Sequence, residues 1–370
     1  MNERDATMND SNAAPGSSPG EDVLDLAETE DEEVGVPLRY AISSYGADHP
    51  VDGLIKRVLR GDIYVPEFQR GFVWNLPQAS RFVESLLLGL PVPGIFLFKE
   101  PDTQKLVVVD GQQRLRTLEG YYGGVLLGKE FALRGVCEEF AGLTYKRLRE
   151  EDRRRLDDAI LHATVFQQED PRGGRSSIYM IFERLNTGGT PLSSQEIRSC
   201  MYRGPFNDLL KELANTEHWR TVYGPSNRRG KDQELILRFF ALYHSANTYA
   251  RPMKQFLNDF MEKNRSIASS ASENWKNLFL KTAEYAANHL GRNKFRPERN
   301  LNAAVFDAFF VSLAKRLSTG PISMPANLAA AADRALADPA FTKSVSSGTT
   351  DLEAIRVRLK VASDALARVQ

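Results

Sequence analysis

The sequence predicts an α+β protein, in which a small mixed sheet with helices is followed by a mostly α-helical half. Short apolar runs alternate with helical periods up to about residue 203, as expected when strands and helices share one core. From about Gly204 to the C-terminus only helical periods remain. At roughly 150 residues per domain, a chain of 370 residues suffices for two domains and a tail.

Three parts are expected along the chain. Residues 1–38 contain 11 Asp and Glu against one Arg and are rich in Ser, Gly and Pro, which predicts a disordered acidic tail. Residues 39–203 are expected to form the α+β domain, and residues 204–370 the helical domain. Residues 39–370 contain 47 Lys and Arg against 37 Asp and Glu, a net charge of +10. Such a basic body suits DNA or nucleotide phosphates, and the acidic tail could compete for the same surface.

Composition excludes several classes of protein. Two Cys without C-x-x-C spacing indicate a reducing compartment, so we expect the cytoplasm. No secretion signal opens the chain, and the longest apolar run, residues 86–98, is shorter than the ~20 residues of a membrane helix. The five His are scattered, so we expect no zinc, and nothing in the sequence suggests haem, flavin or a membrane partner.

The α+β part begins with a helix and a strand. Apolar residues recur at helical spacing over residues 51–59, and Gly61 ends this helix. Residues 63–70 have the composition of a strand. Asn75 is the expected N-cap of a second helix, which runs to about Leu88.

Two further strands are expected at residues 94–99 and 105–109, joined by a turn at Pro101-Asp102. The run Leu-Val-Val-Val in the second strand is uninterrupted, as expected of a central strand covered on both faces. After Asp110-Gly111 the apolar period becomes helical. A strand is expected at residues 161–167 and a helix at residues 176–185, which residues 186–189 close. A new helix begins near Ser193, and further helices are expected at residues 234–243, 252–261 and 301–317.

Residues 110–114, which we call the Asp110 turn, form the segment with the strongest signs of a binding or catalytic site. Glycine at a strand-to-helix turn lets the backbone approach a ligand, and the N–H groups of the first helical turn bind anions. Arg114 and Arg116 oppose the helix dipole there, which a phosphate ligand would explain. Asp110 could hold a metal ion or orient a water molecule. The structural alternative is that Asp110 caps the helix and the arginines bind surface carboxylates.

A P-loop is excluded. Residues 123–130 match G-x-x-x-x-G-K but place Glu130 where the P-loop needs Ser or Thr to bind magnesium. The segment also follows a helix rather than a strand. It is interpreted more simply as a hairpin that turns at Gly128-Lys129.

A second polar cluster surrounds Gly188-Gly189. The glycines serve as a helix stop, and Ser193-Ser-Gln-Glu196 is a capping box, so part of the cluster has a structural explanation. Four polar residues keep no structural assignment, and two of them, Arg184 and Asn186, could face a nucleotide or a DNA backbone. The four are Glu183, Arg184, Asn186 and Arg198.

Four segments, in this order, resemble the N-terminal domain of GmrSD-type, modification-dependent restriction enzymes. They are Val65–Trp74, Val83–Pro93, Val109–Leu115 and Phe182–Gly189. The resemblance covers roughly residues 40–320 and implies a ParB/sulfiredoxin-like fold. In that family the Asp-Gly-Gln-Gln-Arg motif is associated with binding and hydrolysis of nucleoside triphosphates.

The resemblance implies roles for individual residues. Asp110 would hold Mg²⁺ or orient water, while Arg70 and Arg114 would neutralise phosphate charge in the transition state, following the general logic of phosphoryl transfer. These three are the expected catalytic residues. The expected nucleotide-binding residues are Gln69, Gly111, Gln112, Gln113, Arg116 and Thr117.

We therefore expect a cytoplasmic DNA-defence protein, of the restriction or anti-phage kind, that binds and hydrolyses a nucleoside triphosphate with Mg²⁺. Its expected partner is DNA, modified or not. The 370 residues contain no His-Asn-His nuclease pattern, so DNA cleavage would need a nuclease partner subunit or an unrecognised site. The rival interpretation is a non-catalytic adaptor that binds DNA or nucleotide and recruits an effector nuclease. Direct nicking of DNA ranks third, since fold alone is weak warrant for it.

Overall fold

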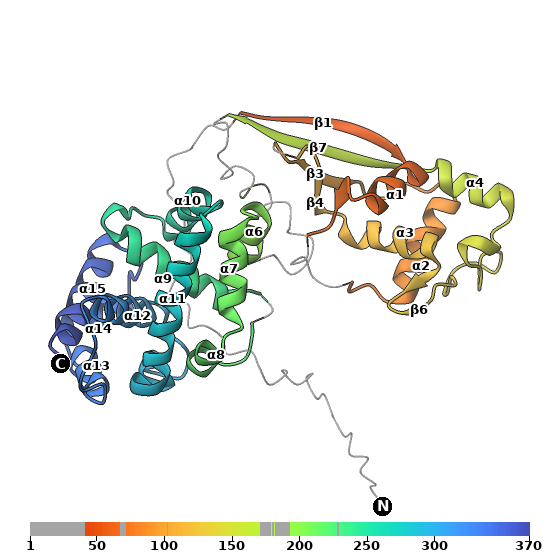
Figure 1. Cartoon of the computed structure of the whole chain (residues 1–370). Coiled ribbons are helices and arrows are strands. Elements are labelled where there is room, and N and C mark those ends of the chain that lie inside the picture. The colour runs from red at the N-terminus through yellow and green to blue at the C-terminus, as the bar shows by residue number, and fades with distance from the viewer. Residues whose placement is uncertain are drawn as a thin grey trace, which may run out of the picture.

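The computed structural model describes residues 41–66, 72–101, 103–170, 179, 181, 193–227 and 229–370. Figure 1 shows an α+β part, residues 41–170, beside a helical part, residues 193–370. This arrangement confirms the predicted fold class. The predicted acidic tail and the helix predicted at residues 176–185 lie wholly or mostly outside the described residues, as do five predicted site residues: Gln69, Arg70, Glu183, Arg184 and Asn186.

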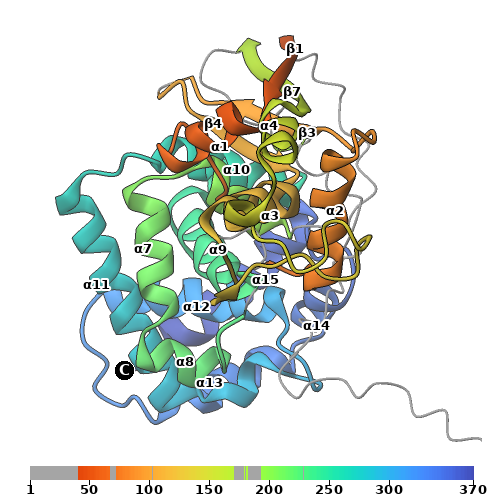
Figure 2. The same ribbon diagram turned by 90° about the vertical axis from the view of Figure 1, so that its right-hand side faces the viewer.

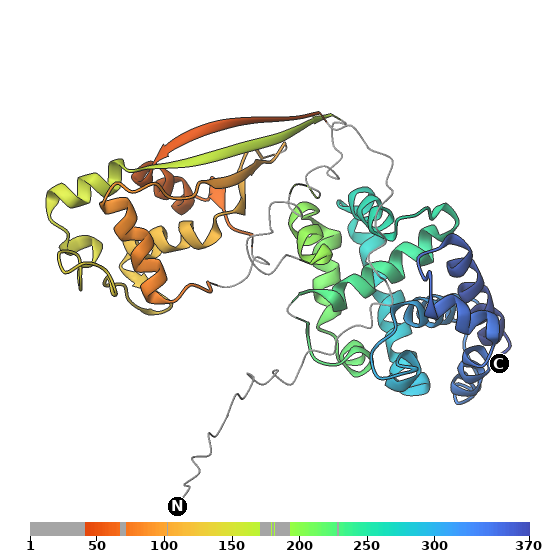
Figure 3. The same cartoon turned by 180° about the vertical axis from the view of Figure 1, so that it is seen from behind.

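A mixed sheet of five strands, in the order β1-β7-β3-β4-β2, forms the α+β part. β1 (Ala41–Pro50) pairs antiparallel with β7 (Ile160–Asp170) along its whole length. β7 pairs parallel with β3 (Ile95–Lys99), and β3 pairs antiparallel with β4 (Leu106–Asp110). β2 (Ile63–Tyr64) adds a short parallel edge to β4. β1 and β7 extend along the α+β part toward the helical part (Figures 1 and 3).

Helices cover one face of this sheet. The segments predicted at residues 51–59 and 76–88 form helices, and Asn75 is the N-cap of the second, in a capping box with Gln78. The hairpin that replaces the rejected P-loop is present, but its turn lies at Leu127-Gly128, one residue earlier than predicted. The elements are α1 (Val51–Leu59), α2 (Leu76–Leu87), α3 (Gln112–Gly123), β5 (Val125–Leu126), β6 (Lys129–Glu130), η1 (Tyr145–Arg147) and α4 (Glu150–Asp158).

β4 is buried on both faces, as its uninterrupted apolar run predicts. Leu106 and Val108 pack into the core formed with α1 to α4. Val107 and Val109 point to the opposite face and belong to the apolar cluster of the helical part. Since successive side chains of a strand alternate between faces, the strand that leads to the Asp110 turn contacts both cores.

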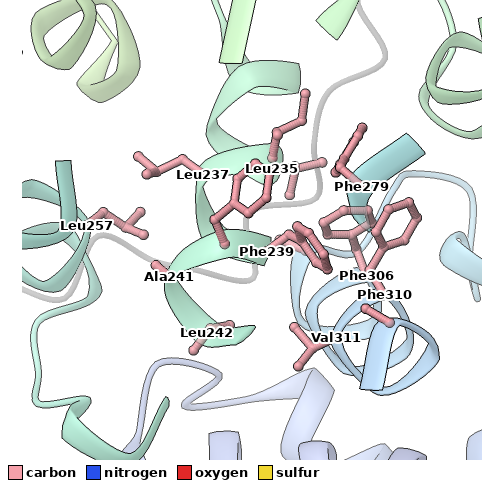
Figure 4. Packing of buried hydrophobic residues seen from close by; sticks show 14 of the residues in the cluster. Leu235, Leu237, Phe239, Ala241, Leu242, Leu257, Phe279, Phe306, Phe310 and Val311 are labelled. Carbon is pink, nitrogen blue, oxygen red and sulfur yellow. The ribbon is translucent and has the colours of Figure 1, made fainter. Parts of the chain in front are cut away.

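The helical part is built around α12 (Ala303–Ser318), a helix buried on nearly all sides. Aromatic rings of α9, α11 and α12 pack edge-on and tilted against one another there (Figure 4). The remaining elements are α6 (Ser194–Met201), α7 (Pro205–Ala214), α8 (Glu217–Tyr223), α9 (Lys231–Ser245), η2 (Ala246–Thr248), α10 (Met253–Asn264), α11 (Ser269–Tyr285), η3 (Ala286–Leu290), η4 (Arg292–Phe295), α13 (Asn327–Leu336), α14 (Pro339–Ser346) and α15 (Leu352–Ala367).

α6 lies before the predicted domain boundary at residue 203, yet its buried residues Ile197, Cys200 and Met201 belong to the helical core. Ser193 and Glu196 form the predicted capping box at its start. Viewed from the α+β side, the sheet and its helices lie in front of the helical part (Figure 2). None of the helices described in the structure is long and apolar enough to cross a membrane.

Candidate functional site

The Asp110 turn joins the end of β4 to the start of α3. Gly111 is the N-cap of α3 and has φ of +103°, in the left-handed region. No side chain among the described residues caps this helix, so Asp110 does not serve as its N-cap. The alternative in which Asp110 caps the helix is therefore wrong, and the first turn of α3 keeps the uncapped character of an anion site.

Glycine is required at position 111 for a reason that the sequence did not reveal. A Cβ atom there would lie 2.4 Å from Cγ2 and 2.8 Å from Cβ of Ile95 on β3. Any side chain would also be strained by the positive φ. The close approach that Gly111 allows is thus at least partly an approach to the neighbouring strand.

Gly111→Ala should lower the free energy of unfolding by about 2–4 kcal/mol, because it adds both backbone strain and a clash with Ile95. Urea unfolding measures this change. Gly123→Ala is the matched control: it lies in the same helix with open space around it, and should change stability by less than about 1 kcal/mol. Equal losses of stability in the two variants would contradict the conclusion that position 111 requires glycine.

Asp110 and Arg114 form an ion pair across the turn. Nη2 of Arg114 donates to Oδ2 of Asp110 at 2.7 Å, and the two residues are four positions apart. The Arg114 side chain is mostly buried, whereas 43% of the Asp110 side chain remains exposed. Nε of Arg114 is buried and has no hydrogen-bond partner among the residues that the structure describes. The pair thus holds a carboxylate and a guanidinium side by side at the helix start, with the carboxylate open to solvent.

Arg116 and Thr117 differ in their access to a ligand. Arg116 is half-buried, has no carboxylate partner within the described part of the chain, and keeps a buried Nε without a hydrogen-bond partner. Thr117 is wholly buried, and its Oγ1 likewise has no hydrogen-bond partner in the part of the chain that is described. A contact between Thr117 and a ligand would require the fold to open, so Thr117 is the weakest of the predicted binding residues.

Gln112 and Gln113 both face protein. Gln112 is 9% exposed. Oε1 of Gln113 accepts hydrogen bonds from the backbone N–H groups of Val73 (3.0 Å) and Trp74 (3.3 Å). Gln113 therefore fixes the start of α3 to the segment that leads into α2, which suits a positioning role.

Arg198 has the structural assignment that the sequence left open. It is 1% exposed in α6, and its Nε donates to Oδ1 of Asn258 at 2.9 Å. Its Nη1 donates to Oε2 of Glu234 at 2.9 Å and to Oε1 of Gln195 at 3.3 Å. These partners lie on α6, α9 and α10, so the contacts of Arg198 tie it to the helical core and not to the Asp110 turn.

Residues 51–203 match the family model described as GmrSD restriction endonuclease, N-terminal domain. This stretch carries a GmrSD N-terminal domain. The match confirms the resemblance seen in the sequence motifs, and the GmrSD stretch contains the Asp110 turn, the Gln113 contacts and α6. It ends at residue 203, so most of the helical region expected within the resemblance lies beyond it. A search among curated proteins found no match.

A magnesium ion in the GmrSD domain would rely on few protein ligands. Among the residues that the structure describes, no group of three or more His, Cys, Asp or Glu is placed to hold a metal ion. Asp110 offers one exposed carboxylate at the turn. Mg²⁺ commonly binds through one or two carboxylates together with substrate phosphates and water. The donor set therefore fits an ion that arrives with a nucleotide, with Asp110 as its protein ligand.

Sequence reasoning missed two features of the site. The Asp110–Arg114 pair could have been predicted, since residues four apart on a helix are neighbours. The bonds from Val73 and Trp74 to Gln113 span about 40 positions of sequence. No local pattern signals such a contact.

Proposed function

We propose that the GmrSD domain binds a nucleoside triphosphate with Mg²⁺ at the Asp110 turn and hydrolyses it. The observation that supports this most is the uncapped helix start at Gly111, beside the mostly buried Arg114 and beside Arg116, which has no carboxylate partner in the described ranges. Backbone N–H groups at a helix start and two cations attract phosphate oxygens. Its ion pair with Asp110 gives Arg114 a structural explanation, but Arg116 has no carboxylate partner among the described residues.

The proposed roles follow from this placement. Asp110 would hold the magnesium ion, which neutralises charge on the phosphates. Arg114 orients Asp110 and would turn toward the transferred phosphoryl group as its charge redistributes. Arg70 is proposed as a second cation and Gln69 as a binding residue, on the strength of the family motif alone.

The cellular role that we propose is restriction-type DNA defence in the cytoplasm, with DNA and a nuclease subunit as partners. The family name supports the restriction role. The charge distribution supports DNA contact through the helical part: residues 193–370 contain 26 Lys and Arg against 17 Asp and Glu, whereas residues 41–170 contain 17 against 19. Polyanion binding by such a surface should weaken steeply with salt.

Phosphate release from each of the four common nucleoside triphosphates, with Mg²⁺ and with or without DNA, tests the proposal. We expect turnover of at least one nucleotide by the wild type and none by a folded Asp110→Ala variant. The nucleotide site would be refuted if the folded wild type neither bound nor hydrolysed any of these nucleotides. Binding without turnover would instead support the adaptor, which recruits an effector nuclease and has no hydrolysis to lose.

A further inference from the structure

The strand that carries the Asp110 turn is held by the helical part. Val109, the residue before Asp110, is 2% exposed. It belongs to one contiguous apolar cluster with Cys200, Met201 and Tyr202 at the end of α6. The strand end that leads into the turn is therefore packed in the same apolar cluster as the end of α6, and packed interiors do not deform freely.

A direct contact joins the neighbouring strand β2 to the segment that follows α6. The guanidinium carbon of Arg203, which follows α6, lies 4.6 Å from the ring centroid of Tyr64. Tyr64 is on β2, which pairs with β4, and its hydroxyl donates to Oε1 of Glu100 at 2.8 Å. Burial, and then the bond to Glu100, raise the pKa of Tyr64, so the hydroxyl keeps its proton and remains a donor.

Arg203 is anchored on its other side to α10. Its carbonyl oxygen accepts from Nε of Arg265 at 2.8 Å. A Cβ on the next residue, Gly204, would lie 2.6 Å from the Arg265 carbonyl oxygen. Within the described part of the chain Arg203 has no carboxylate partner, so the Tyr64 ring is what its guanidinium contacts. The path β4–β2–Tyr64–Arg203–Arg265 therefore links the turn to the end of α10 through direct contacts.

We infer that the Arg203–Tyr64 contact transmits nucleotide occupancy of the Asp110 turn to the helical part, and so regulates the DNA contact proposed for that part. This inference rests on the proposed nucleotide site. A contact transmits occupancy only if its strength differs between the empty and the occupied state. Breaking it should remove the response of α6 and α10 while leaving the nucleotide site itself assembled.

Amide hydrogen exchange on the full chain, with and without a non-hydrolysable nucleoside triphosphate and Mg²⁺, measures this response. In the wild type we expect nucleotide to change exchange at residues 194–206 and 253–265 by about threefold or more, the scale of a contact of this kind. Arg203→Met should abolish that change while nucleotide affinity stays within about threefold, a small shift on the scale of allosteric coupling. Arg203→Lys, which keeps a cation over the ring, should restore part of the response.

Two controls separate this role from a structural one. Tyr64→Leu removes the ring from the other side of the contact and should have the same effect as Arg203→Met. It therefore tests the inference even if Arg203→Met fails to fold. Arg356→Met, at an exposed arginine of α15, should leave the response intact.

The possible outcomes distinguish failure of the inference from failure of the nucleotide site. Nucleotide binding with an unchanged helical part in the wild type would overturn the inference but not the nucleotide site. A response that persists in both Arg203→Met and Tyr64→Leu would overturn it as well. No nucleotide binding by the folded wild type would refute the proposed function, and the inference would fall with it.

Discussion

Replacing Asp307 by Asn should lower the free energy of unfolding by about 3–5 kcal/mol, the cost of leaving buried charge without its partner. Asp307 lies on α12 with no exposed surface. Its Oδ2 accepts from Nη2 of Arg238 at 2.6 Å and from Nη2 of Arg358 at 2.9 Å, and Nε of Arg238 reaches Oδ1 at 3.1 Å. Both arginines are themselves buried, so the substitution leaves two guanidinium ions in the core without the carboxylate between them.

Urea unfolding of purified variants measures the effect. Asp333→Asn is the matched control, because Asp333 pairs with Lys294 while 59% of its side chain is exposed, and such surface pairs contribute about 0–1 kcal/mol. Arg358→Met should cost less than Asp307→Asn, since it leaves Arg238 and Asp307 as a one-to-one pair. A stability of Asp307→Asn equal to that of Asp333→Asn would show that the buried charges do not hold these helices together.

Arg114→Ala should reduce kcat/KM for nucleoside triphosphate hydrolysis by about 100-fold or more, the usual loss when one stabilising cation or donor leaves a transition state. The substitution removes the guanidinium that pairs with Asp110 at 2.7 Å. Arg114→Lys should recover only part of the rate, because an ammonium ion does not reproduce the planar fork of a guanidinium. Phosphate release under saturating and limiting nucleotide separates kcat from KM.

Arg60→Ala is the control for this experiment. Arg60 also pairs with an aspartate, Asp62 at 3.0 Å, but 67% of its side chain is exposed and it lies at the end of α1. Its loss should leave turnover within about twofold, since surface pairs contribute little. A folded Arg114→Ala protein with wild-type kcat/KM would remove Arg114 from the mechanism.

Local signals in the sequence were sufficient for most helices and for the buried strands. Asn75 predicts the start of α2 because an N-cap depends only on the residues that follow it directly, and the structure adds Gln78 as its capping-box partner. The apolar run of β4 predicts burial on both faces, and the structure places one face on each core. These features depend on neighbours in sequence, so they are visible before the chain folds.

Other elements depend on pairing across long distances in sequence. β1 was not predicted, because its side chains are mostly exposed and the segment contains no apolar run. It is a strand because β7, more than 100 residues later, supplies its hydrogen bonds. The hairpin turn was predicted one residue late, since Leu127 adopts φ of +52°, a conformation that a leucine rarely takes.

In the candidate site, too, some features follow from neighbouring residues and others from tertiary contacts. The chemistry of the Asp110 turn, with its carboxylate, glycine and arginines, follows from residues adjacent in the sequence, as does the change from strand to helix around them. The partners of Gln113, the packing of Ile95 on Gly111 and the burial of Arg198 follow from tertiary contacts alone. A side chain's type sets what it can bind, but its partner is whichever distant segment the folded core brings within hydrogen-bond reach.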